Sequence, residues 1–81
     1  MDELKRYEYQ YIIMQEIDNG ELKTKKFEVR SKTSDVLLGV IKWHGAWRQY
    51  CFFPEGETVF SVGCMECLNF FLTNLGHERR G

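Results

Sequence analysis

The sequence lacks the charge excess that marks several classes of binding protein. Its 11 Lys and Arg residues nearly balance 12 Asp and Glu residues, which gives a formal net charge of −1. Proteins that bind nucleic acid without sequence preference rely on many contacts between Lys or Arg and phosphate, and they usually carry a basic excess. The overall charge therefore argues against that function, although a local basic patch remains compatible with it.

The sequence also lacks long apolar runs. No stretch approaches the roughly 20 apolar residues of a membrane-spanning helix, and residues 1–9 lack the apolar region of a secretory signal peptide. The chain contains three cysteines, Cys51, Cys64 and Cys67. An odd number of cysteines without a secretion signal favours reduced thiols. We therefore expect a cytoplasmic protein that does not bind a membrane.

What the chain does contain is a large apolar fraction for its size. Its 81 residues predict a single domain, 1–81, in which 43% of residues are hydrophobic and 15% are aromatic. A domain of this size buries only about 60–65% of its unfolded surface. Either the core is unusually aromatic, or a second chain covers part of the apolar surface. The second alternative predicts a homodimer or a complex with a protein partner.

Hydrophobic alternation and turn residues predict an α+β fold. We expect an antiparallel β-meander of about four strands, followed by one C-terminal helix packed on one sheet face. The expected strands are residues 7–17, 24–30, 36–43 and 47–53, the expected helix is 62–75, and a tail covers 76–81. Residues 4–17 also have the spacing of a helical stripe, so strand and helix both remain open for that segment.

The first expected hairpin turn is Asn19-Gly20. Both residues tolerate the positive φ angles of a two-residue turn. This turn would place Ile17 opposite Leu22, but the apolar residues further along the two strands then fail to match. The mismatch indicates a bulge or a shifted register.

The last two expected strands carry apolar side chains on both faces. A three-residue loop at 44–46 would pair Trp43 with Trp47. A helix covers only one face of a small sheet, so the other face would present apolar side chains to a partner. The alternatives are a strongly curled sheet, or a helical first segment that covers this second face.

The expected helix has a clear start and a clear end. Ser61 is the expected N-cap, because its hydroxyl can accept a hydrogen bond from a free backbone N–H. Gly76 is expected to end the helix as a C′ glycine. An apolar arc of roughly 160° should pack on the sheet, and it contains Cys64, Met65, Cys67, Leu68, Phe71, Leu72 and Leu75.

The pair Cys64-x-x-Cys67 stands at the start of this helix, where redox enzymes place such motifs because the helix dipole stabilises a thiolate. Both sulfurs lie on the apolar arc, so we predict two buried thiols that pack in the core. Zinc would require a second close pair of ligands. The candidates for that pair, Cys51, His44 and His77, are not closely spaced. We therefore predict no metal and no cofactor.

The hairpin between the last two strands contains the candidate binding residues Trp43, His44, Trp47, Arg48 and Tyr50. Aromatic and basic side chains in this mixture can hold single-stranded nucleic acid. They can equally lock the hairpin, with Arg48 over an aromatic ring. No catalytic triad, phosphate loop or carboxylate pair is visible. We predict a non-enzymatic protein without a small-molecule substrate, which binds a protein partner or itself through an aromatic sheet face, or alternatively single-stranded nucleic acid.

The segment 43–54 follows the pattern Trp-x-x-x-Trp-Arg-x-Tyr-x-Phe-x-Pro, and Thr58-Val59-Phe60 and Cys64 come after it. In this pattern the chain resembles a family of small uncharacterised bacterial and bacteriophage proteins, over residues 27–75. The resemblance implies a phage or mobile-element setting. It implies no activity and no functional residue, and the Tyr-rich N-terminal segment lies outside it.

Overall fold

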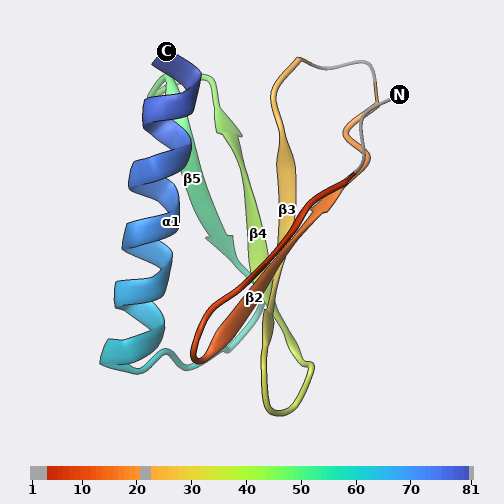
Figure 1. Ribbon diagram of the computed structural model, residues 1–81, viewed down its shortest axis with the longest axis vertical. Helices are drawn as coiled ribbons and strands as arrows, with labels where there is room; N and C mark the ends of the chain where they lie inside the picture. The colour runs from red at the N-terminus through yellow and green to blue at the C-terminus, as the bar shows by residue number, and fades with distance from the viewer. Residues whose placement is uncertain (1–3, 21–22, 81) are drawn as a thin grey trace.

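The computed structural model describes the backbone of residues 4–20 and 23–80, and the side chains of this part as far as His77. The described residues form an antiparallel sheet and one C-terminal helix, so the predicted α+β class is correct (Figure 1). The sheet has five strands in the order β1-β2-β3-β4-β5 rather than about four. The elements are β1 (Arg6–Glu8), β2 (Ile12–Ile17), β3 (Lys26–Ser31), β4 (Leu37–His44), β5 (Gln49–Pro54) and α1 (Val62–Arg80).

The first segment forms two strands instead of the single strand expected at 7–17, and it is not helical. β1 and β2 pair antiparallel, with Tyr7 opposite Met14. The backbone N–H of Tyr9 donates to the carbonyl of Ile12 (2.9 Å) and closes the turn between them. The turn contains no glycine, proline or asparagine, so the usual residues that mark a turn are absent from the sequence here.

The connection between β2 and β3 is longer than the expected two-residue turn. Ile17 pairs with Lys26, so the register is shifted, which was one of the two explanations for the apolar mismatch. The Asn-Gly pair lies within this loop, and Gly20 has a φ of 65°. The expected partner of Ile17, Leu22, lies outside the described residues.

The β4–β5 hairpin has a four-residue loop, 45–48, instead of the expected three-residue loop. The backbone N–H of Arg48 donates to the carbonyl of His44 (2.8 Å), and Arg48 has a left-handed φ of 56°. Trp43 consequently pairs with Tyr50, and the expected pair of Trp43 with Trp47 is wrong. Because side chains alternate along a strand, this change of register exchanges the residues of β5 that share a face with Trp43.

The helix begins as expected and ends later than expected. The backbone N–H of Cys64 donates to the hydroxyl of Ser61 (3.2 Å), which confirms the N-cap. α1 continues through Gly76 to Arg80, so the expected C′ glycine and the tail from residue 76 are wrong. Gly76 does not adopt the left-handed conformation that ends helices at glycine. Gly81 lies outside the described residues.

The core lies between α1 and one face of the sheet. The ring of Phe71 packs edge-to-face against Phe27 and Tyr7, with centroid distances of 4.9 and 5.1 Å. The expected apolar arc of the helix is largely confirmed, but Met65 is 55% exposed. The buried apolar residues are Ile12, Met14, Phe27, Val29, Leu38, Ile41, Leu68, Phe71 and Leu75.

We expect Gly39→Ala to lower the free energy of unfolding by about 1–3 kcal/mol, because it overpacks the β4–β5 ladder. A Cβ atom at Gly39 would lie 2.5 Å from the carbonyl oxygen of Phe53 and 2.6 Å from the ring of Phe52. Gly45 is the matched control, since a Cβ atom there meets nothing within 4 Å. Urea denaturation of both variants measures the difference, and equal stability would contradict this description of the ladder.

A second prediction concerns stability at high pH. Burial raises the pKa of Tyr9 above its ordinary value of 10.0, and the neighbouring Cys67 and Tyr7 raise it further. Above pH 10 the unfolded chain therefore releases this phenolic proton before the folded chain does, so folding loses stability as pH rises. Denaturant unfolding from pH 8 to 11 should show a smaller loss in Tyr9→Phe than in the wild type. Identical losses would contradict it.

Candidate interaction groove

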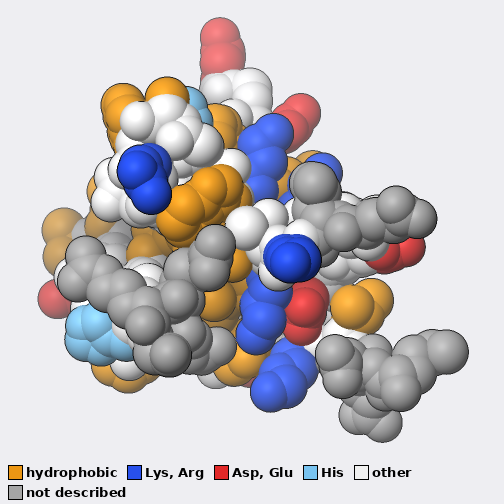
Figure 2. Space-filling model, turned by 90° about the horizontal axis from the view of Figure 1, so that it is seen from above, with side chains coloured by type: hydrophobic (Ala, Val, Ile, Leu, Met, Phe, Trp, Pro, Cys, Tyr) orange, Lys and Arg blue, Asp and Glu red, His pale blue; other side chains and the backbone are white. Residues whose placement is uncertain are grey.

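A groove lies between the β4–β5 hairpin and the C-terminal half of α1, with a volume of about 760 Å³. We call it the hairpin groove. Its sheet-side residues are Trp43, Trp47, Arg48, Gln49, Tyr50, Cys51 and Phe52, and its helix-side residues are Leu72, Thr73, Gly76 and His77. Figure 2 looks onto the end of the molecule where the helix ends, and shows apolar side chains bordered by Lys and Arg side chains.

The inner part of the groove is built by Trp43 and Tyr50. These residues are paired across β4 and β5, and their rings pack edge-to-face with centroids 5.3 Å apart. The hydroxyl of Tyr50 accepts a hydrogen bond from the backbone N–H of Lys25 (3.1 Å). Both rings are half-buried. They therefore give the groove a rigid aromatic wall and attach it to the start of β3.

The rim is formed by the hairpin loop. Trp47 is 67% exposed, and its ring centroid lies 4.8 Å from that of His44. Arg48 holds its left-handed backbone although it is not glycine. Such conformations cost free energy and are found preferentially at functional sites. The loop therefore keeps a cationic side chain at the rim where glycine would fit the backbone better.

Four of the five predicted site residues line the groove, and His44 does not. His44 lies on the opposite sheet face, where its ring packs between Trp47 and Phe53, with the Phe53 centroid 5.8 Å away. The structure places a cation–π contact at Lys42 rather than at Arg48. The Nζ atom of Lys42 lies 4.8 Å from the centroid of the Phe53 ring. The His44 ring thus packs against the Trp47 ring from the side opposite the groove.

The sequence interpretation did not assign the helix side of the groove to the binding site. Leu72 and Thr73 fell within the expected helix, whereas Gly76 and His77 fell in the expected tail because the helix was expected to end at residue 75. These four positions have the spacing of one helix face. That spacing was the available signal. Among the lining residues whose side chains the structure describes, none is Asp or Glu, whereas Arg48 is cationic and His77 is exposed. This part of the lining therefore favours anionic groups.

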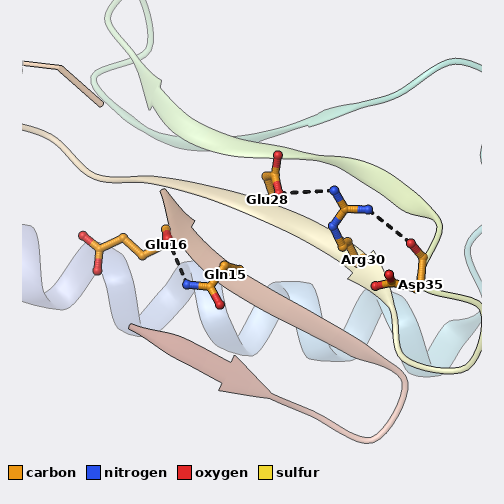
Figure 3. A network of polar contacts seen from close by, with 5 residues as sticks. All are labelled: Gln15, Glu16, Glu28, Arg30 and Asp35. Atoms are coloured by element: carbon orange, nitrogen blue, oxygen red, sulfur yellow. Dashed lines mark hydrogen bonds and ion pairs between the residues drawn. The ribbon is translucent and has the colours of Figure 1, made fainter. Parts of the chain in front are cut away.

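The open face of the sheet, opposite α1, is less apolar than expected. Its apolar side chains are half-buried, and charged residues of β3 stand between them. Figure 3 shows Arg30 bonded to the Glu28 carboxylate (3.4 Å) and to the backbone carbonyl of Asp35 (3.2 Å). The apolar residues of this face are Ile13, Ile17, Leu37, Val40, Cys51 and Phe53. The face therefore alternates apolar and ionic groups, and the groove is the more distinctive surface.

The cysteines are free thiols, and each is half-buried. Cys64 and Cys67 pack against the core, so the expectation of buried thiols is correct only in part. Among the described residues, no three His, Cys, Asp or Glu side chains gather closely enough to hold a metal ion. Within the same part of the chain, no helix has both the length and the apolar character needed to cross a membrane.

Comparison with known proteins finds one phage relative. No protein-family model matches the sequence, and no solved structure matches the chain. The sequence is 33% identical over 58 residues to the "Uncharacterized 9.3 kDa protein" of Acholeplasma phage L2. The aligned part covers 72% of this chain and 74% of the phage protein.

The strained loop residue yields a stability prediction. We expect Arg48→Gly to be more stable than Arg48→Ala by about 1 kcal/mol, because glycine adopts the left-handed conformation without steric cost. Both variants remove the same charged side chain, so their difference isolates the backbone effect. Chemical denaturation compares them, and an Arg48→Ala variant as stable as Arg48→Gly would show that position 48 is not strained.

Proposed function

Since the chain belongs to the same family of small phage-type proteins as the phage L2 protein, we propose that it is a non-enzymatic interaction protein that binds a protein partner at the hairpin groove. The observation that supports this most is the convergence of Trp43, Trp47, Arg48 and Tyr50 with one face of α1. Trp, Tyr and Arg are the residues that contribute most to binding at protein interfaces. The proposed setting is the cytoplasm, where free thiols persist.

The chemistry of the groove supports binding rather than catalysis. Among the described lining residues, His77 is the one histidine and Cys51 the one cysteine. Alternation along β5 puts the side chain of Cys51 on the face away from α1, and its thiol donates to the carbonyl of Gln49 (3.9 Å). A nucleophile–base pair of these two side chains is therefore not formed.

Single-stranded nucleic acid is the second candidate, and the mixture of rings with Arg48 and His77 favours it. Such proteins stack successive bases on exposed aromatic faces. Here Trp43 and Tyr50 pack against each other, and the Tyr50 hydroxyl is bonded to the backbone of Lys25. Trp47 is the lining aromatic residue with a largely exposed ring. Protein binding therefore fits the groove better.

We expect a host or phage protein to be retained by immobilised wild-type protein after nuclease treatment, and to be lost with Trp47→Ala and with Arg48→Gly. Retention should weaken less than about tenfold from 50 to 200 mM salt, whereas a complex with 6–10 phosphate contacts weakens by about 10³–10⁵. Met65→Ala, which removes an exposed apolar side chain outside the groove, is the control and should retain the partner.

The competing function is tested on the same variants. Titration of a labelled single-stranded oligonucleotide should show no saturable binding at physiological salt. Saturable binding that disappears in Trp47→Ala and Arg48→Gly, while both remain folded, would replace the proposal with nucleic-acid binding.

Light scattering gives the assembly state of the protein. A mass near 9.7 kDa corresponds to a monomer, and twice that mass would make a second copy the partner.

A further inference from the structure

β5 is the edge strand of the sheet next to the groove. The backbone N–H of Glu55 donates to the carbonyl of Leu38 (2.9 Å) and fixes the hydrogen-bonding phase of the β4–β5 ladder. Peptide groups alternate in direction along an antiparallel strand. Cys51 and Phe53 therefore direct their N–H and C=O groups toward β4, whereas Tyr50 and Phe52 direct theirs outward.

Pro54 agrees with this phase. It is the next residue in the outward series, and proline has no N–H to leave unpaired there. Among the described residues, no strand pairs with the outward edge of β5. The backbone N–H and C=O groups of Tyr50 and Phe52 thus point outward from the edge of the sheet. The two residues lie about 6.8 Å apart along the strand.

The hairpin groove runs along this same edge. Four consecutive residues of β5, 49–52, line it, and the facing wall is the C-terminal half of α1. Figure 1 shows α1 running alongside β5. The volume of the hairpin groove, about 760 Å³, lies within the range of roughly 300–1,000 Å³ typical of ligand sites. The unpaired edge therefore opens into a space bounded by a helix, as in domains that bind peptides by strand addition.

We propose that the partner binds as an extended peptide segment, which adds a sixth strand to β5 inside the hairpin groove and places a carboxylate side chain against Arg48. The inference rests on the proposed function and specifies its mode. A row of alternating N–H and C=O groups is complementary to another peptide backbone and not to a sugar–phosphate chain. The carboxylate follows from charge, because Arg48 is at the rim and the part of the lining that the structure describes contains no Asp or Glu.

Gly76 supplies a selective way to block this mode. It is half-buried in the helix wall, and a Cβ atom built there meets nothing within 4 Å. A large side chain at this position would extend into the groove without displacing the core. Gly76→Phe should therefore fill the groove in a folded protein, and Gly76→Ala is the matched control that leaves most of it open.

The test uses random decapeptides displayed on a library and selected on the immobilised full-length protein. We expect enriched peptides to carry Asp or Glu beside alternating apolar residues. Gly76→Phe should weaken the best peptide at least about tenfold and Gly76→Ala about twofold or less. N-methylation of the peptide at a paired backbone nitrogen should also weaken binding about tenfold, through loss of a hydrogen bond. Replacing the acidic residue by Asn or Gln should matter in the wild type and not in Arg48→Gly.

Amide hydrogen exchange locates the strand directly. In the free protein, the N–H groups of Tyr50 and Phe52 should exchange fast and those of Cys51 and Phe53 slowly, and bound peptide should slow the first pair. Protection of Tyr50 and Phe52 in the free protein, together with a dimer mass, would make a second copy the occupant and overturn the proposal.

Two further outcomes separate this inference from the proposed function. Peptides that bind equally well to Gly76→Phe, or that tolerate N-methylation at every position, would overturn strand addition. If a partner protein is still captured by the wild type and lost with Trp47→Ala, the proposed function stands without this mode. Failure to enrich any peptide would likewise overturn the inference, while the capture experiment decides the proposed function independently.

Discussion

The position of the helix depends on one aromatic contact, the packing of Phe71 into the sheet. Its ring meets Phe27 of β3 and Tyr7 of β1 edge-to-face, an arrangement that adds to the free energy of apolar burial. Helix side chains thus reach the far strands, while the helix itself runs beside β5. Together with the buried Leu68 and Leu75, this contact holds the helix axis beside β5, where the groove forms.

The groove depends on both the length of the β4–β5 loop and the length of α1. The four-residue loop puts Trp43 and Tyr50 on the helix side of the hairpin, and the continuation of α1 past Leu75 adds Gly76 and His77 to the opposite wall. A loop of three residues would have placed different side chains of β5 beside Trp43. A helix ending at Leu75 would have kept Leu72 and Thr73 in the facing wall but would have removed Gly76 and His77 from it. The two features that differ most from simple sequence patterns are those that create the site.

Sequence reasoning predicted the class of fold because its signals are local. Alternation located the last three strands to within a few residues, and the Ser61 cap and the apolar arc located the helix start and its buried face. Loop lengths were not predictable in this way. The loop at 45–48 depends on a left-handed Arg48, which no residue preference indicates, and the turn at 9–11 lacks turn residues. The five predicted site residues were chosen by the chemical type of their side chains. Composition does not reveal the strand register, and it is this register that places His44 apart from the other four.

The open edge of β5 also bears on how the protein stays dispersed. Unpaired strand edges can template the growth of fibres, and natural proteins oppose this with proline, charge and very short edge strands. β5 has two of these features, since it ends at Pro54 and Arg48 directly precedes it. The helix alongside limits access to the same edge from one side. These features oppose the open-ended pairing of one sheet edge with another, which is the contact that leads to aggregation.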